Sequence, residues 1–307
     1  MTAPGAGLRE PQTFAGPSRL ARYASLVKLP HTVFALPFAL VGVVLASYRY
    51  AVTARQVAWV VVAFTAARFA AMAFNRIVDR DVDAANPRTA TREIPSGALG
   101  VREAQLATFA AGLAFVGAAW ALNPLCGWLA PVALLWVLGY SYAKRVTRWS
   151  HLVLGLGLGI APVGGYLAVA GRWGEPWWLL PALSLAVTTW VAGFDIFYAL
   201  QDEQFDRAHG LRSVPAAFGQ ARAIGVARGL HAATVALLAA VATTVPGRTA
   251  ALWAWAGVAV AAALLAWEHR LVRPGDLSRL DAAFFTMNGV ISIAFFACVL
   301  VGRVLAR

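Results

Sequence analysis

The chain has 307 residues, of which 60% are hydrophobic and only 13% are charged, and its mean hydropathy is +0.66. Soluble domains carry roughly 25% charged residues, so this composition excludes a disordered chain, a disulfide scaffold and an ordinary soluble enzyme. The net charge of +12 needs no nucleic-acid partner, because the cytoplasmic loops of membrane proteins collect Lys and Arg. The composition therefore predicts a polytopic membrane protein.

Nine apolar stretches follow a polar N-terminal segment, residues 1–28, which is not predicted to be a cleavable signal because it has no apolar core. A helix needs roughly 20 residues to cross a bilayer, and lipid offers backbone groups no other hydrogen-bond partner. The predicted spans are 31–48, 56–77, 102–121, 125–143, 150–170, 178–199, 221–245, 249–270 and 280–303. Close helix packing is predicted at the glycines of the fifth span, Gly155, Gly157, Gly159, Gly164 and Gly165. We therefore expect an all-α protein with one transmembrane domain over residues 29–303.

Loop charge predicts the orientation of the chain. Most of the 26 Lys and Arg residues lie in the N-terminal segment and in the loops that follow the second, fourth, sixth and eighth spans. The positive-inside rule places those parts in the cytoplasm, and nine spans then leave the C-terminus outside. The expected location is the cell inner (plasma) membrane, as a multi-pass protein.

The acidic residues gather in two short windows. Eight of the 14 lie in residues 79–93 or 195–206, and each window sits at the cytoplasmic end of a predicted span, the second and the sixth. Acids on the basic side of a membrane protein contribute little to its topology. Two acidic windows on a basic background therefore suggest sites for divalent cations.

Helical spacing supports this interpretation. The two sets of polar residues are Asn75, Asp79 and Asp83, and Asp195, Asp202 and Asp206. On one continuous helix the first set covers an arc of about 80° and the second about 40°. Carboxylate and amide oxygens suit Mg²⁺, which takes one or two carboxylates together with substrate phosphate oxygens. The alternative is that the aspartates are helix-end charges paired with local arginines such as Arg80 and Arg207.

Basic residues near these windows suggest a clamp for a diphosphate. Arg88 and Arg92 follow the first window, and guanidinium groups beside carboxylates that hold a cation bind phosphate oxygens. A further polar patch at the end of the fourth span contains Lys144 and Arg145. These two residues are either ordinary positive-inside anchors or further phosphate contacts, and the same two interpretations apply to Lys28.

These motifs resemble those of the UbiA superfamily of intramembrane prenyltransferases, in its 4-hydroxybenzoate polyprenyltransferase-like branch. Residues 75–83 are similar to the first aspartate-rich motif, although this chain has Arg76 where the family often has Asp. Residues 86–97 are similar to the continuation of that motif, and residues 195–215 to the second motif. The resemblance covers about residues 20–300 and implies a nine-helix bundle around a central cavity, with the acidic loops capping its cytoplasmic mouth.

The resemblance implies Mg²⁺-dependent transfer of a polyprenyl group from a polyprenyl diphosphate to an aromatic acid. The acid would be 4-hydroxybenzoate in ubiquinone synthesis or a naphthoate-type acid in menaquinone synthesis. Metal and arginine charge would stabilise the leaving diphosphate, and the allylic cation would attack the aromatic ring within the lipid bilayer. The expected metal ligands are Asn75, Asp79, Asp83, Asp195, Asp202 and Asp206. The expected catalytic residues are Asp79, Asp83, Asp202 and Asp206, and the expected substrate contacts are Lys28, Arg88, Arg92, Lys144, Arg145 and Tyr198.

Two alternatives stay open. An enzyme of the same fold with another acceptor (haem, a chlorophyll precursor, homogentisate or a glycerol lipid) would use the same ionisation step. A cation-coupled transporter agrees less well with the sequence, because transporter sites usually lie near the bilayer midplane at interrupted helices.

Overall fold

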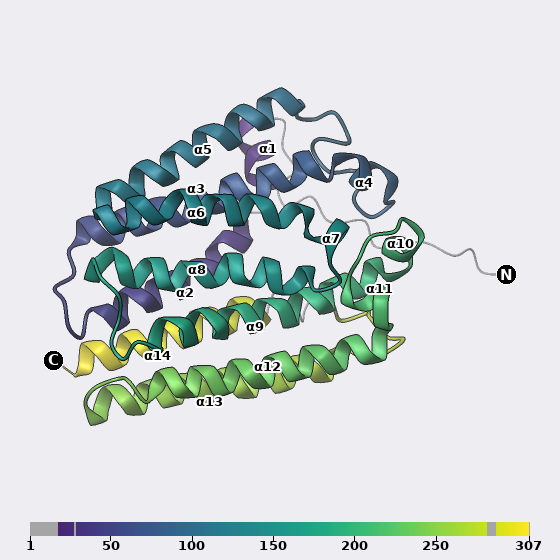
Figure 1. The fold of residues 1–307 in the computed structure, drawn as a ribbon. Coiled ribbons are helices and arrows are strands. Elements are labelled where there is room, and N and C mark those ends of the chain that lie inside the picture. Colours follow the sequence, from purple (N-terminus) through teal and green to yellow (C-terminus); the bar gives the residue numbers. More distant parts are fainter. Residues whose placement is uncertain (1–17, 28, 281–286, 307) are drawn as a thin grey trace.

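The computed structural model describes residues 18–27, 29–280 and 287–306, and its long helices lie side by side in one bundle (Figure 1). In chain order the helices are α1 (Arg19–Leu26), α2 (Leu29–Ala46), α3 (Ala54–Val78), α4 (Arg80–Ala85), α5 (Val101–Leu122), α6 (Pro124–Gly139), α7 (Ala143–Val146), α8 (Ser150–Ala170), α9 (Leu179–Ala199), α10 (Glu203–Ala208), α11 (Val214–Phe218), α12 (Gln220–Ala242), α13 (Arg248–Leu271) and α14 (Asn288–Leu305). Two 3₁₀ turns, η1 (Tyr140–Tyr142) and η2 (Leu200–Asp202), connect α6 to α7 and α9 to α10.

The predicted membrane-spanning architecture is confirmed. Within the described ranges, eight helices are long and apolar enough to cross a membrane, and the apolar stretch Ala35–Ala46 of α2 is a shorter ninth. Each predicted span coincides with one of the long helices α2, α3, α5, α6, α8, α9, α12, α13 and α14. The short helices α4, α7, α10 and α11 gather at one end of the bundle, opposite the end at which α14 finishes (Figure 1).

Local sequence determines where several helices begin and end. The side chain of Thr53 caps the start of α3 and, together with Gln56, forms a reciprocal capping box. Asn123 caps α6, and Pro124 follows it at the first helical position, where a missing N–H costs nothing. Gly171, with φ of 64°, ends α8 in the left-handed conformation that a side chain would disfavour.

The helices are broken at both acidic windows. α3 ends just before Asp79 and α4 begins just after it, while α9 gives way to the 3₁₀ turn that carries Asp202 and then to α10. The prediction that each polar set shares the face of one continuous helix is therefore wrong. α4 and α10 lie at one end of the bundle (Figure 1), and Asp83 on α4 and Asp206 on α10 are buried there.

The end of the polar N-terminal segment packs on the bundle. α1 buries Leu26 completely, and the hydroxyl of Tyr23 donates to Glu103 at the start of α5 over 3.0 Å. The Tyr23 ring also lies 6.2 Å from the ring of Phe69 on α3. α1 is therefore attached to α3 and α5 at the end of the bundle that carries α4.

Helix α8 makes close backbone contacts on both sides. A Cβ atom added to Gly165 would lie 2.0 Å from the carbonyl oxygen of Ala39 on α2, and one added to Gly155 would lie 2.3 Å from that of Thr188 on α9. A Cβ at Gly164 would meet no atom within 4 Å. The predicted close packing is confirmed at Gly155, Gly159 and Gly165, and it is wrong at Gly157 and Gly164.

These two neighbouring glycines supply a matched test of the packing. We expect Gly165→Ala to destabilise the protein by about 1–3 kcal/mol, because the new methyl group overlaps Ala39 and forces α2 and α8 apart. Gly164→Ala is expected to change stability by less than about 0.5 kcal/mol, as exposed or open sites usually do. The measurement is the thermal unfolding temperature of each purified variant in detergent. Equal losses in the two variants would contradict the close approach of α2 and α8.

Candidate active site

A cavity of about 460 Å³ runs through the bundle between α3, α6, α8 and α9. Along α3 its wall extends from Val60 to Asp79, the residue that follows the helix, which at 1.5 Å per residue is about 28 Å, close to the thickness of the hydrocarbon core. Apolar side chains line most of this length, among them Phe64, Ala130, Leu158, Val163 and Trp190. The expected central cavity is therefore present, and its polar wall lies at the end covered by α4 and α10.

The first acidic window supplies two carboxylates to this polar end. Asp79 accepts a hydrogen bond from the amide nitrogen of Asn75 at 2.8 Å, and its other oxygen lies 3.0 Å from Arg145 on α7. Asp83 on α4 accepts from Arg92 at 2.6 Å. Burial raises the pKa of Asp79 above its usual value, and the neighbouring Arg145 guanidinium opposes that rise.

The second acidic window is tied to the loop that follows the first. Arg88 donates to both oxygens of Asp202, from Nε at 2.9 Å and from Nη2 at 2.6 Å, and Asn86 adds a third hydrogen bond at 3.1 Å. Arg88 also donates to the hydroxyl of Tyr198 at 2.8 Å. On α10, Asp206 lies 3.5 Å from the ammonium group of Lys144.

Each of the four predicted catalytic aspartates is therefore paired with a different basic side chain of the predicted clamp. The pairs are Asp79 with Arg145, Asp83 with Arg92, Asp202 with Arg88, and Asp206 with Lys144. The cations neutralise carboxylates that would otherwise be costly to bury. Because Lys144 and Arg145 are adjacent on α7, this short helix holds one aspartate of each window.

The donor set fits a divalent cation, although the aspartates are not gathered around one point. Among the described residues, no group of three His, Cys, Asp or Glu side chains lies close enough together to hold a metal ion. The Oδ2 atoms of Asp83 and Asp206 are buried without a hydrogen bond, although they lie 4.0 Å from Arg76 and 3.5 Å from Lys144, and both residues line the cavity. Carboxylate oxygens that line a cavity and have no hydrogen bond are hard ligands, of the kind that Mg²⁺ takes together with phosphate oxygens.

Asp195 has a different kind of partner from the other predicted ligands. It lines the cavity from α9, and its Oδ2 lies 2.6 Å from the Nδ1 atom of His151 on α8. No role is predicted for any histidine from the sequence, because a lone His in an apolar span gives no signal of its partner. Lys28, predicted as a substrate contact, lies outside the described residues.

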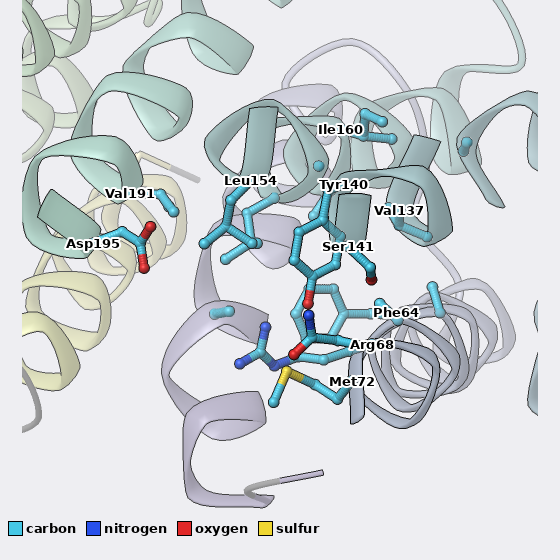
Figure 2. A pocket seen from close by; sticks show the side chains of 18 of the residues that line it. Phe64, Arg68, Met72, Val137, Tyr140, Ser141, Leu154, Ile160, Val191 and Asp195 are labelled. Carbon is cyan, nitrogen blue, oxygen red and sulfur yellow. The ribbon is translucent and has the colours of Figure 1, made fainter. Parts of the chain in front are cut away.

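Arg68 is a second residue near the site that the spacing of the acidic residues does not predict. It lies within α3, ten residues from the end of the helix, and lines the cavity with its Nε atom buried and without a hydrogen-bond partner. Figure 2 shows Arg68 beside Tyr140, with Asp195 on the opposite side of the pocket. A single arginine inside a membrane span was the available signal, because such residues are costly and usually functional.

Comparisons with known proteins identify the family of the chain. Residues 35–297 match the model of the UbiA prenyltransferase family. The chain is 34% identical over 235 residues to a 4-hydroxybenzoate octaprenyltransferase of Aromatoleum aromaticum. The aligned residues cover 76% of this chain and 77% of that protein. A protein of the same name from Yersinia enterocolitica is 30% identical over 230 residues, which cover 74% of this chain and 77% of that protein.

Solved structures show the same fold. The apo structure of a UbiA homologue from Aeropyrum pernix K1 aligns with a TM-score of 0.79 and 35% identity, covering 88% of this chain and 97% of that one. A UbiA homologue from Archaeoglobus fulgidus bound to DMAPP and Mg²⁺ aligns with a TM-score of 0.72 and 21% identity, covering 92% of this chain and 99% of that one. The chain belongs to the UbiA prenyltransferase family and is a multi-pass membrane enzyme that transfers prenyl groups.

Proposed function

We propose that this enzyme transfers a polyprenyl group from a polyprenyl diphosphate to a hydroxylated aromatic acid, with 4-hydroxybenzoate as the favoured acceptor. The observation that carries the proposal is the distribution of charge in the cavity. Cations and carboxylates gather at one end, and Arg68 stands within the apolar part opposite Asp195. The 4-hydroxybenzoate octaprenyltransferase names of the relatives support this choice.

The polar end is suited to a diphosphate. When the aspartates bind metal, the four cations paired with them become available for phosphate oxygens, so that ligand binding exchanges one set of ion pairs for another. The diphosphate contacts would be Arg88, Arg92, Lys144 and Arg145, with Lys28 as a further contact from the N-terminal side. This rim would then stabilise the negative charge that develops as the leaving group departs.

The metal ligands of the proposal are Asn75, Asp79, Asp83, Asp202 and Asp206. Mg²⁺ bound there would neutralise the diphosphate and act as a Lewis acid on its oxygens. The DMAPP and Mg²⁺ bound to the Archaeoglobus fulgidus homologue support a divalent metal in this fold. Asp195, the sixth ligand expected from the sequence, hydrogen-bonds His151, and we assign it to the acceptor instead.

The acceptor site is proposed at the boundary between the polar end and the apolar wall. Arg68 would bind the carboxylate of the acid, since a guanidinium group forms strong paired hydrogen bonds with carboxylates. Asp195, across the pocket, would accept a hydrogen bond from the hydroxyl group. An acid with its hydroxyl opposite its carboxylate matches these two groups, which is why we favour 4-hydroxybenzoate and ubiquinone synthesis over a naphthoate-type acid and menaquinone synthesis.

The rest of the cavity is suited to the prenyl tail. Its apolar wall extends along α3, α6 and α8, where a hydrocarbon chain is shielded from water together with the allylic cation formed on ionisation. Tyr198 lines the cavity beside Arg88 and is proposed to face this cation or the acceptor ring. We also propose that the site opens toward the cytoplasm of the inner membrane, with a polar N-terminal segment over residues 1–28 and the transmembrane domain over residues 29–303.

Product analysis tests the acceptor. Membranes that contain the protein are supplied with Mg²⁺, a polyprenyl diphosphate and an equimolar mixture of 4-hydroxybenzoate, 1,4-dihydroxy-2-naphthoate and homogentisate, and the products are identified by mass spectrometry. We expect prenylated 4-hydroxybenzoate as the main product and none after chelation of the metal. A main product derived from another acceptor would contradict the acceptor assignment, while diphosphate release with that acceptor would leave the donor site intact.

A further inference from the structure

His151 stands directly behind the cavity wall. It belongs to the first turn of α8 and is 1% exposed, whereas the Asp195 carboxylate that it contacts lines the cavity and is 22% exposed. The imidazole therefore has no access of its own to a substrate in the cavity. Any effect that it has on the reaction must be transmitted through Asp195.

The two hydrogen bonds of the imidazole define which nitrogen carries the proton. The backbone N–H of Val214, at the start of α11, donates to Nε2 of His151 over 3.3 Å. A nitrogen that accepts a hydrogen bond carries no proton, so the ring proton lies on Nδ1 and is donated to Oδ2 of Asp195 over 2.6 Å. Nδ1 is thus the donor in the contact with Asp195, and Nε2 is the acceptor in the contact with Val214.

This arrangement separates Asp195 from the other motif aspartates. Those four carboxylates each face a guanidinium or ammonium group that can leave for a phosphate. The partner of Asp195 is a buried imidazole that is held by the backbone of α11, so it is not able to move away to a phosphate. A fixed donor on one oxygen leaves the carboxylate in one orientation while it still lines the cavity.

We propose that His151 is a positioning residue that orients Asp195 to accept a hydrogen bond from the hydroxyl group of the aromatic acceptor. This inference rests on the proposed function, because it needs a hydroxylated acceptor in the cavity. His151 transfers no proton in this role. It supplies an N–H that holds the carboxylate, in the way that a carboxylate or carbonyl holds the imidazole of many catalytic histidines.

A set of three substitutions isolates the Nδ1–H group. His151→Asn places an amide N–H near the position of Nδ1, His151→Gln places its amide nearer to Nε2, and His151→Leu removes both polar atoms while keeping an apolar side chain. We expect His151→Leu and His151→Gln to raise the KM for 4-hydroxybenzoate by about 10-fold or more, which is the usual effect of losing a hydrogen bond to a charged group. The KM for the polyprenyl diphosphate is expected to stay unchanged, and His151→Asn to recover most of the lost affinity for the acceptor.

Comparison of the variants decides between positioning and packing. His209→Leu is the control, because His209 is exposed at the end of α10 and lies outside the cavity wall. If all three His151 variants raise the KM values for both substrates, and each rise follows the fall in the unfolding temperature, His151 only packs and the inference is overturned. Recovery by Gln and not by Asn would overturn it too, because the contact with Val214 would then be the one that matters.

Acceptor binding gives a readout that does not depend on turnover. Trp190 lines the cavity, so binding of 4-hydroxybenzoate is measured by quenching of tryptophan fluorescence in the wild type and in each variant. If the wild type binds the acid but does not prenylate it, the proposed function fails, while the order of the variant Kd values still tests His151. If the wild type binds no hydroxylated aromatic acid, the inference is overturned.

Discussion

Asp202→Asn is expected to lower the rate of prenyl transfer by about 10³-fold, the scale of effect seen when a group that stabilises developing charge is removed. The asparagine keeps the shape of the side chain but loses the negative charge that would bind metal. In the wild type Arg88 donates to both Asp202 oxygens, and the substitution leaves it without this anionic partner. The measurement is the initial rate in membranes with saturating Mg²⁺, polyprenyl diphosphate and 4-hydroxybenzoate.

Two other acids, one from each acidic window, provide matched controls for this loss. Glu203 follows Asp202 directly, but its carboxylate pairs with the exposed Arg207 at 3.0 Å, and the residue does not line the cavity. Asp81 lies between Asp79 and Asp83 in the first window, with its side chain 83% exposed. Glu203→Gln and Asp81→Asn are expected to retain nearly full activity. Turnover by Asp202→Asn at the level of these controls would exclude the assignment of the second window to the metal and diphosphate site.

Arg68→Met is expected to lower kcat/KM for 4-hydroxybenzoate by about 10²-fold, because truncating one partner of a buried charge pair costs several kcal/mol. Methionine keeps the length and apolar contacts of the side chain but removes the guanidinium that would bind the carboxylate. The reaction with phenol, which has no carboxylate, should change far less. The ratio of the two kcat/KM values therefore measures the contribution of Arg68 to carboxylate recognition.

The control for this variant lies on the same helix. Arg55 is exposed at the opposite end of α3 and does not line the cavity, so Arg55→Met should leave both reactions unchanged. A parallel fall in the 4-hydroxybenzoate and phenol reactions of Arg68→Met would refute a specific carboxylate contact. It would instead indicate that Arg68 supports the shape of the cavity beside Tyr140.

The positions of the helices followed from the chain alone because hydropathy is a local property. Each long helix coincides with an apolar stretch of the sequence, and the acids and arginines at the polar end of the cavity lie where charge interrupts those stretches. The breaks at Asp79 and at Asp202 were not predicted. Helical periodicity assumes a continuous helix, whereas Asp83 and Asp206 are buried on the separate short helices α4 and α10.

The composition and the two aspartate-rich windows were sufficient to determine a polytopic helical membrane protein of the UbiA family, since both are read from consecutive residues. Only the tertiary structure decided which charges meet. Arg88 and Asp202 are 114 residues apart, and His151 on α8 and Asp195 on α9 are 44 residues apart. Such pairs depend on the rotation and packing of whole helices, which no local pattern specifies. The same holds for Arg68. The sequence shows it as a charge within a span, but only the packing of α3 places its side chain in the cavity wall.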